Sequence, residues 1–226
     1  MLDFEICSEK DFSLLKGMDP FKSIAVPRPI AWISTVSKDG IDNLAPFSQF
    51  NNLSFDPPMV MISFQHGGTE ENSTRKDTLN NIEETGFFVY NIVPYALREQ
   101  MNITAIPTKN LDEFEAAGLT KADCIQVPCK RVAESPIQFE CEYFQTIHIP
   151  SRSKRGVIDM VLGRVLEVHI ADEVLTPDGK IDFLKIKPLG RMGYFDYTYV
   201  NEVFTMPIPG LSVKQMESFS GEHKGK

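Results

Sequence analysis

The fold is decided by the stretch I-Q-F-E-C-E-Y, residues 137–143, in which apolar and polar residues alternate at every position. A period of two is typical of a β-strand with one face in the core and the other in water. Such half-buried strands occur in antiparallel sheets, because parallel strands are usually buried on both faces. The stretch therefore predicts an antiparallel sheet, with Gln138 and Glu140 on its solvent face and Cys141 buried as a small hydrophobe.

Further strands are predicted on either side of this stretch by runs of β-branched and aromatic residues. These runs are residues 30–36, 59–64, 87–93 and 157–170, and the first stretch itself extends to residue 149. A turn signal at Asp39-Gly40 predicts that residues 43–51 return beside residues 30–36 as a hairpin. Pro46 restricts this return strand to a sheet edge or a bulge, because proline cannot donate to the ladder.

Three short helices are predicted between the strands. They cover residues 78–84 with Asp77 as the cap, residues 95–101 opened by Pro94, and residues 111–117 ended by Gly118. The expected fold is mainly β, a closed or nearly closed barrel with short helical excursions.

One domain is expected over residues 1–204, because 226 residues with 42% hydrophobic and 24% charged content are typical of a single globular unit. Residues 205–226 are expected to form an extended arm and a flexible tail. The net charge of −8 argues against binding nucleic acid or acidic membranes non-specifically. The chain shows no apolar run of membrane-spanning length, no signal peptide at its start and no cysteine or histidine spacing of a zinc site. We expect a cytoplasmic protein without a structural metal.

A phosphate-binding segment is indicated by residues 72–78, N-S-T-R-K-D-T. Two cations, Arg75 and Lys76, and three hydroxyl groups lie just before a predicted helix start. Amide N–H groups at a helix N-terminus attract anions, and cations there oppose the helix dipole unless an anion lies between them. The alternative interpretation is a polar loop in which Asp77 only caps the helix.

A second polar cluster is expected where residues 30–36 pair with residues 43–51. Small polar groups there would suit a planar, hydrogen-bonding ligand, and they belong to Ser34, Thr35, Ser48, Gln49 and Asn51. The same pattern also fits the ordinary wet face of a strand. His66 is expected in a turn, His148 and His169 on solvated strand faces, and residues 152–155 at a basic hairpin tip.

Seven segments occur in a characteristic order along the chain. They are R-P-I-A-W-I-S-T (28–35), D-G-I-D-N-L-A-P-F-S-Q-F-N (39–51), D-P-P-M-V (56–60), R-K-D-T-L-N-N-I (75–82), E-S-P-I-Q-F-E-C (134–141), L-G-R-V-L-E-V-H-I (162–170) and L-G-R-M-G-Y-F-D-Y (189–197). Together they resemble the flavin reductase-like, FMN-binding split-barrel family, including its flavoredoxin-like branch. The resemblance implies a Greek-key split β-barrel, a homodimer with flavin near the interface, and FMN as the cofactor.

The resemblance also implies where the flavin binds. Ser34, Thr35 and residues 45–51 resemble the wall along the flavin ring and ribityl chain, and residues 75–78 resemble the phosphate end. Together with the two polar segments, it predicts these cofactor-binding residues: Arg28, Trp32, Ser34, Thr35, Ala45, Pro46, Phe47, Ser48, Gln49, Asn51, Arg75, Lys76, Asp77 and Thr78. No catalytic residue is predicted.

The chain departs from the family at Gly156-Val157-Ile158, where reductase members carry Gly-Asp-His with the histidine near the nicotinamide. NADH, NADPH and a redox protein therefore all stay open as electron donors. The first functional hypothesis is an FMN-dependent oxidoreductase, whose chemistry belongs to the flavin. The alternative is a module that binds or stores flavin without turnover. Steady oxidation of a reduced pyridine nucleotide with added flavin would separate the two.

Overall fold

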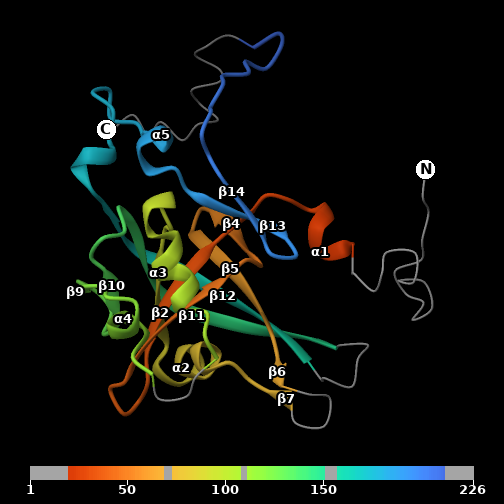
Figure 1. The fold of residues 1–226 in the computed structure, drawn as a ribbon, viewed down its shortest axis with the longest axis vertical. Coiled ribbons are helices and arrows are strands. Elements are labelled where there is room, and N and C mark those ends of the chain that lie inside the picture. Colours follow the sequence, from red (N-terminus) through yellow and green to blue (C-terminus); the bar gives the residue numbers. More distant parts are fainter. Residues whose placement is uncertain (1–19, 69–72, 108–110, 151–156, 212–226) are drawn as a thin grey trace.

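An antiparallel sheet dominates the computed structural model, which describes residues 20–68, 73–107, 111–150 and 157–211 (Figure 1). Within these ranges the main sheet has seven strands in the order β3-β2-β8-β11-β12-β5-β4. Their bounds are β2 Ala31–Val36, β3 Asp42–Phe47, β4 Phe50–Phe55, β5 Pro58–Gln65, β8 Phe87–Asn91, β11 Ile137–Pro150 and β12 Val157–Ile170. All five sequence runs predicted as strands are confirmed, with ends that differ by at most a few residues.

The sheet closes on itself because its two edge strands are consecutive in the chain. Only Ser48 and Gln49 separate β3, at one edge, from β4, at the other. The amide of Ser63 in β5 donates to the carbonyl oxygen of Gln49 at 2.8 Å. This connection produces a nearly closed barrel and confirms the mainly β, split-barrel prediction.

The predicted hairpin is confirmed only in part. Trp32 pairs with Pro46 between β2 and β3, and Pro46 lies on an edge strand as expected. Asn51, however, belongs to β4 and pairs with Met61 of β5. The return strand was predicted too long because the chain passes from one barrel edge to the other after Phe47.

Helix α2, Asp77–Thr85, packs against the barrel interior and lies at the lower end of the barrel in Figure 1. Its Leu79 and Ile82 are fully buried in the main core cluster with Phe64 and Phe88. Gly86 ends the helix at φ 83°, a left-handed conformation that glycine adopts without strain. The capping prediction was wrong by one position, since Asp77 is the first helical residue and Lys76 is the N-cap.

The predicted solvent face of β11 was also wrong, since Gln138 and Glu140 are buried. The segment from β9, Lys121–Asp123, to β10, Lys130–Val132, covers them. Glu140 accepts backbone N–H groups from Ile125 and Gln126 at 2.8 and 2.6 Å. It also bonds to Nε2 of His169 at 2.6 Å, so this histidine is not simply solvated. The buried Cys141 confirms the prediction made for it.

Shorter elements surround the barrel. Strands β1, β13 and β14 form a three-stranded sheet beside α1 (Figure 1). The remaining bounds are α1 Phe21–Ile24, β1 Arg28–Pro29, β6 Gly67–Gly68, β7 Ser73–Thr74, η2 Tyr95–Leu97, α3 Arg98–Ile103, α4 Glu113–Ala116, η3 Asp172–Val174, α5 Phe183–Ile186, β13 Leu189–Gly193 and β14 Asp196–Tyr199. The helix expected over residues 95–101 is thus a 3₁₀ turn followed by α3, and the one expected over 111–117 is the shorter α4.

Beyond β14, residues 201–210 are exposed and form neither helix nor strand. The extended arm expected from residue 205 stays a prediction, while the expected tail over 212–226 and the basic tip at 152–155 lie outside the described residues. The domain boundary at residue 204 stays a prediction. In the part of the chain that is described, no helix is long and apolar enough to cross a bilayer.

Candidate functional site

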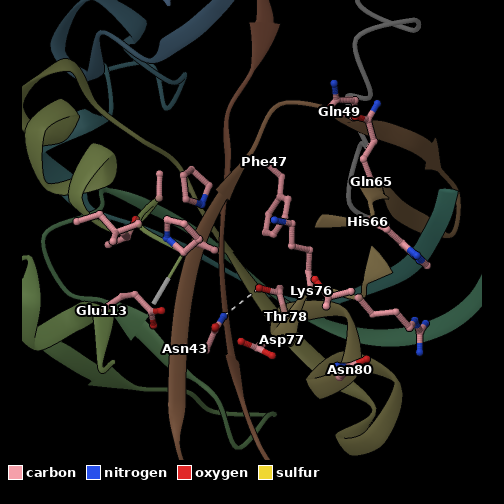
Figure 2. A pocket seen from close by; sticks show the side chains of 18 of the residues that line it. Asn43, Phe47, Gln49, Gln65, His66, Lys76, Asp77, Thr78, Asn80 and Glu113 are labelled. Carbon is pink, nitrogen blue, oxygen red and sulfur yellow. Dashed lines mark hydrogen bonds between the residues drawn. The ribbon is translucent and has the colours of Figure 1, made fainter. Parts of the chain in front are cut away.

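A cavity of about 780 Å³ opens between the barrel and the loops that precede α2 and follow α3. Figure 2 shows its lining, with Glu113 on one side and His66 on the other. Its lining residues are Asn43, Ala45, Pro46, Phe47, Ser48, Gln49, Ser63, Gln65, His66, Thr74, Arg75, Lys76, Asp77, Thr78, Asn80, Thr104, Ala105, Ile106, Pro107 and Glu113. The cavity brings together nine of the residues predicted from sequence: residues 45–49 and 75–78.

The N-terminus of α2 forms the cationic end of the cavity. No side chain caps this helix, because the N-cap residue Lys76 carries no acceptor. The amides of the first turn and the ammonium group of Lys76, which is exposed, are therefore available to an anion.

Arg75 lies beside Lys76 but is partly committed to carboxylates of the protein. Its Nη2 lies 2.8 Å from Glu83, and its Nε lies 3.4 Å from Asp159. Lys76 has no such ion pair with a described carboxylate. Most of the positive charge that can act on a bound anion thus comes from Lys76 and the helix end.

Hydroxyl and carboxylate groups line the cavity next to this cationic end. Asn43 donates from Nδ2 to Oγ1 of the buried Thr78 at 3.0 Å, which is the dashed line in Figure 2. Glu113 accepts the amide N–H of Leu44 at 3.1 Å. Burial, together with the nearby charges of Asp112 and Asp77, raises the pKa of Glu113 above its usual value despite that hydrogen bond. Glu113 and Asp77 therefore favour a hydroxyl-bearing ligand and disfavour a second anion here.

A buried carboxylate connects the opposite wall to Arg75. Asp159 of β12 lies 2.9 Å from Nε2 of His66 and 2.6 Å from Nδ1 of His148. Burial alone would raise the pKa of Asp159, but the two histidines and Arg75 lower it below the usual range. Asp159 thus holds both His66 and Arg75 against the cavity. His148 is exposed, as expected, and His66 lies between β5 and β6, but both also bond to the buried Asp159.

Apart from Arg28, four predicted site residues do not line this cavity. Trp32 is buried and donates from Nε1 to Thr104 at 2.8 Å. Ser34 donates to the carbonyl of Lys130 at 2.6 Å, and the hydroxyl of Thr35 accepts from Asn81 at 3.0 Å. The exposed Asn51 bonds within β4. The first three were placed in the site on the assumption that their strand faces the ligand, whereas they face the protein layers on either side of β2.

Arg28 lies in an adjoining cavity of about 610 Å³ and not beside Lys76. Its wall is shared with the first cavity along residues 46–49.

Several lining residues were missed by the sequence analysis. Ser63 and Gln65 alternate with buried Ile62 and Phe64 on β5, a period-two signal that could have marked them as one polar face. Residues 104–107 and Glu113 carry no such signal, because only the packing of the α3 and α4 regions against β3 brings them to the cavity.

Comparisons with known proteins identify the family of the chain. A family model described as a flavin reductase like domain matches residues 23–201. A protein of Aquifex aeolicus is 38% identical over 174 residues, which cover 75% of this chain and 83% of that protein.

Two solved structures are similar in fold and sequence. The first is nitrilotriacetate monooxygenase component B from Bacillus cereus, with 28% identity, a TM-score of 0.80, and coverage of 91% of this chain and 98% of that one. The second is the 2-nitrobenzoate 2-nitroreductase of Pseudomonas fluorescens, with 26% identity, a TM-score of 0.72, and coverage of 88% and 96%. From the family match over most of its length, the chain belongs to the flavin reductase-like domain family.

Proposed function

We propose that the protein is an FMN-binding oxidoreductase that moves electrons from NAD(P)H or a redox protein to an acceptor. The observation that carries this proposal is the uncapped N-terminus of α2, with Lys76, at one end of a cavity of about 780 Å³. A phosphate at one end and a large ring at the other would fit these two features. Family membership and the two redox proteins among the structural neighbours support the same class of function.

The residues of the cavity fit the parts of FMN. Lys76, Thr78 and the first-turn amides of α2 would bind the phosphate. Asn43, Asp77 and Glu113 offer acceptors and a donor to ribityl hydroxyl groups. Residues 45–49 would support the ring.

When bound, FMN supplies the redox chemistry, and the protein supplies binding, orientation and electrostatics. Phe47, half-buried and packed edge-on against Phe64 at 4.7 Å between ring centres, provides a fixed apolar surface in the wall. His66, held by Asp159, places an imidazole ring on the cavity wall. This division of labour explains why the sequence contains no catalytic motif of its own.

The electron donor is left open by the same structure. Ile158, at the position of the family histidine, pairs with Gln65 and Ile149 and does not line the cavity. Nicotinamide binding would therefore have to rely on other residues, whereas a redox protein needs only an accessible flavin edge.

We also propose a cytoplasmic homodimer. Large apolar side chains are exposed at Phe55, Phe204 and Met206, and isologous pairing would bury such a surface on both subunits at once.

The test begins with the purified protein. Denaturation should release FMN, identified by chromatography against riboflavin and FAD standards. Anaerobic mixing of the FMN-loaded protein with NADH and with NADPH should then bleach the flavin absorbance with at least one of them. Release of no flavin, together with no binding of added FMN, would contradict the proposal. Tight FMN binding without reduction by either nucleotide or by a reduced ferredoxin-type protein would instead favour the storage function.

A further inference from the structure

The second cavity is lined by positive charge and aromatic rings. It adjoins the FMN cavity along residues 46–49, and its far wall is formed by β1, β13 and the turn before β14. Its charged lining residues within the described chain are Lys22, Arg28 and Arg191, without any carboxylate. For a protein with a net charge of −8, three cations around one cavity are a marked local concentration.

Two of these cations face one another. Arg28 of β1 and Arg191 of β13 are register partners in the antiparallel pair, so their side chains lie on the same face. Like charges in directly opposite positions destabilise a sheet unless an anion compensates them. Burial and the positive charge of Arg191 both lower the pKa of Arg28. The second of these causes shows that the two like charges repel one another.

The hydrogen bonds of Arg28 leave part of its guanidinium without an acceptor. Nη1 donates to the carbonyl oxygens of Lys22 and Ala25 at 2.8 and 3.4 Å. Nε is buried and has no hydrogen-bond partner in the described part of the chain. The buried Nε of Arg28 would gain a hydrogen-bond partner from an anion that enters the cavity.

Aromatic side chains lie beside the two arginines. The Arg191 guanidinium lies 4.4 Å from the centre of the Tyr197 ring and donates to the carbonyl of Tyr194. Tyr194 has φ 47°, in the left-handed region that is costly for a residue with a Cβ atom. Backbone strain of this kind is concentrated at ligand clamps and active sites. Phe195 is 93% exposed in the same lining.

We propose that this cavity, the arginine compartment, binds a planar aromatic molecule that carries an anionic group. The anion is bound between Arg28 and Arg191, and the ring lies against Tyr194, Phe195 and Tyr197. Two sources offer this chemistry: an aromatic carboxylate and the phosphate of a nucleotide. Because the compartment shares residues 46–49 with the first cavity, the bound molecule would lie beside the flavin, and this last step rests on the proposed function.

Calorimetric titration tests the binding directly, on FMN-saturated protein and on protein stripped of flavin. The probes are 2-aminobenzoate, its neutral counterpart 2-aminobenzamide, and AMP. We expect 2-aminobenzoate or AMP to bind at least tenfold more tightly than 2-aminobenzamide. Binding of only 2-aminobenzoate assigns the compartment to carboxylates, and binding of only AMP assigns it to nucleotide phosphates.

Arg28→Gln and Arg191→Gln should each lower the affinity for the anion that binds at least tenfold and leave the affinity for 2-aminobenzamide unchanged. Arg164→Gln, at a half-exposed arginine of β12 outside both cavities, is the matched control. Arg28→Gln could fail to fold, because the hydrogen bonds of Arg28 to the carbonyl oxygens of Lys22 and Ala25 are lost. In that case the anion affinity of Arg191→Gln alone tests the proposal.

Equal affinity for the acid and the amide, no binding of either anion, or unchanged affinity in the Arg191 variant would overturn the proposal. A tenfold loss of FMN affinity in both variants would also overturn it, since the arginines would then serve the cofactor. FMN affinity is measured separately, so a protein that binds the anion but not FMN would refute the proposed function alone.

Discussion

Replacing Lys76 with alanine tests the phosphate end of the proposed FMN site. Lys76 is the N-cap residue of α2 and lines the cavity, and its ammonium group forms no ion pair with a described carboxylate. Its charge is therefore free to act on a phosphate. Because the side chain is exposed, its removal should disturb neither the core nor the helix.

The expected loss follows from this setting. A hydrogen bond to a charged group contributes about 1.5–3 kcal/mol, and solvent screening at an exposed lysine favours the lower half of that range. A loss of roughly 1.5–2 kcal/mol weakens FMN binding about 10- to 30-fold. The first-turn amides of α2 and Thr78 remain, so FMN binding should be weakened and not abolished.

The assay is a fluorescence titration of FMN and of riboflavin, which lacks the phosphate. Lys76→Ala should weaken FMN binding about 10- to 30-fold and leave the affinity for riboflavin unchanged. It should also reduce the salt dependence of FMN binding. Lys38→Ala, at an exposed lysine in the turn between β2 and β3, is the control and should change neither ligand. Equal loss of FMN and riboflavin, or no loss of either, would refute the assignment of the phosphate to this helix end.

Three further predictions concern the donor, the stability and the assembly. Ile158→His should speed reduction of bound FMN by NADH if nicotinamide docking limits the rate, and an unchanged rate in an already fast protein would show the missing histidine to be irrelevant. Glu140→Gln should lower the free energy of unfolding by about 3–5 kcal/mol in denaturant titrations, because a buried carboxylate with its backbone and His169 partners is replaced by an amide. Burial alone would raise the pKa of Glu140, but the backbone N–H groups and His169 lower it below its usual value. The stability that Glu140 contributes is therefore present above the unfolded-state pKa of about 4.3 and is lost as the pH falls through the folded-state pKa. Denaturant titrations at several pH values would measure this loss. Truncation after residue 204 should shift the mass measured by light scattering from dimer to monomer, whereas a monomeric full-length protein with flavin bound would contradict the homodimer.

Local patterns in the sequence determined the strands and the start of α2, next to which the proposed phosphate-binding residues lie. Alternation in residues 137–143 and β-branched runs depend only on neighbours along the chain, and they predicted the strands of the main sheet. Lys76 and Thr78 were predicted as phosphate ligands from the same kind of local pattern, because they lie next to the start of α2. The resemblance to the flavin reductase-like family, confirmed by the family match, added the split-barrel topology and flavin as the cofactor class to this local information.

Only the tertiary structure decided which polar residues face the cavity. Glu140 has the sequence pattern of a solvent-facing residue, but a segment 13 to 15 residues earlier in the chain covers it and donates backbone hydrogen bonds to it. Ser34 and Thr35 were predicted to line the binding site, but their hydroxyl groups form hydrogen bonds within the protein. Ser34 donates to the carbonyl oxygen of Lys130, and Thr35 accepts from the side-chain amide of Asn81.

The remaining wall of the site depends on contacts between distant parts of the chain. His66 bonds to Asp159, 93 residues away, and the lining residue Thr104 accepts a hydrogen bond from the buried Trp32, 72 residues away. Arg28 of β1 and Arg191 of β13 are opposite one another in an antiparallel strand pair. Such pairings form when the sheet closes and the side chains compete for buried hydrogen-bond partners, and no local period in the sequence encodes the outcome of that competition.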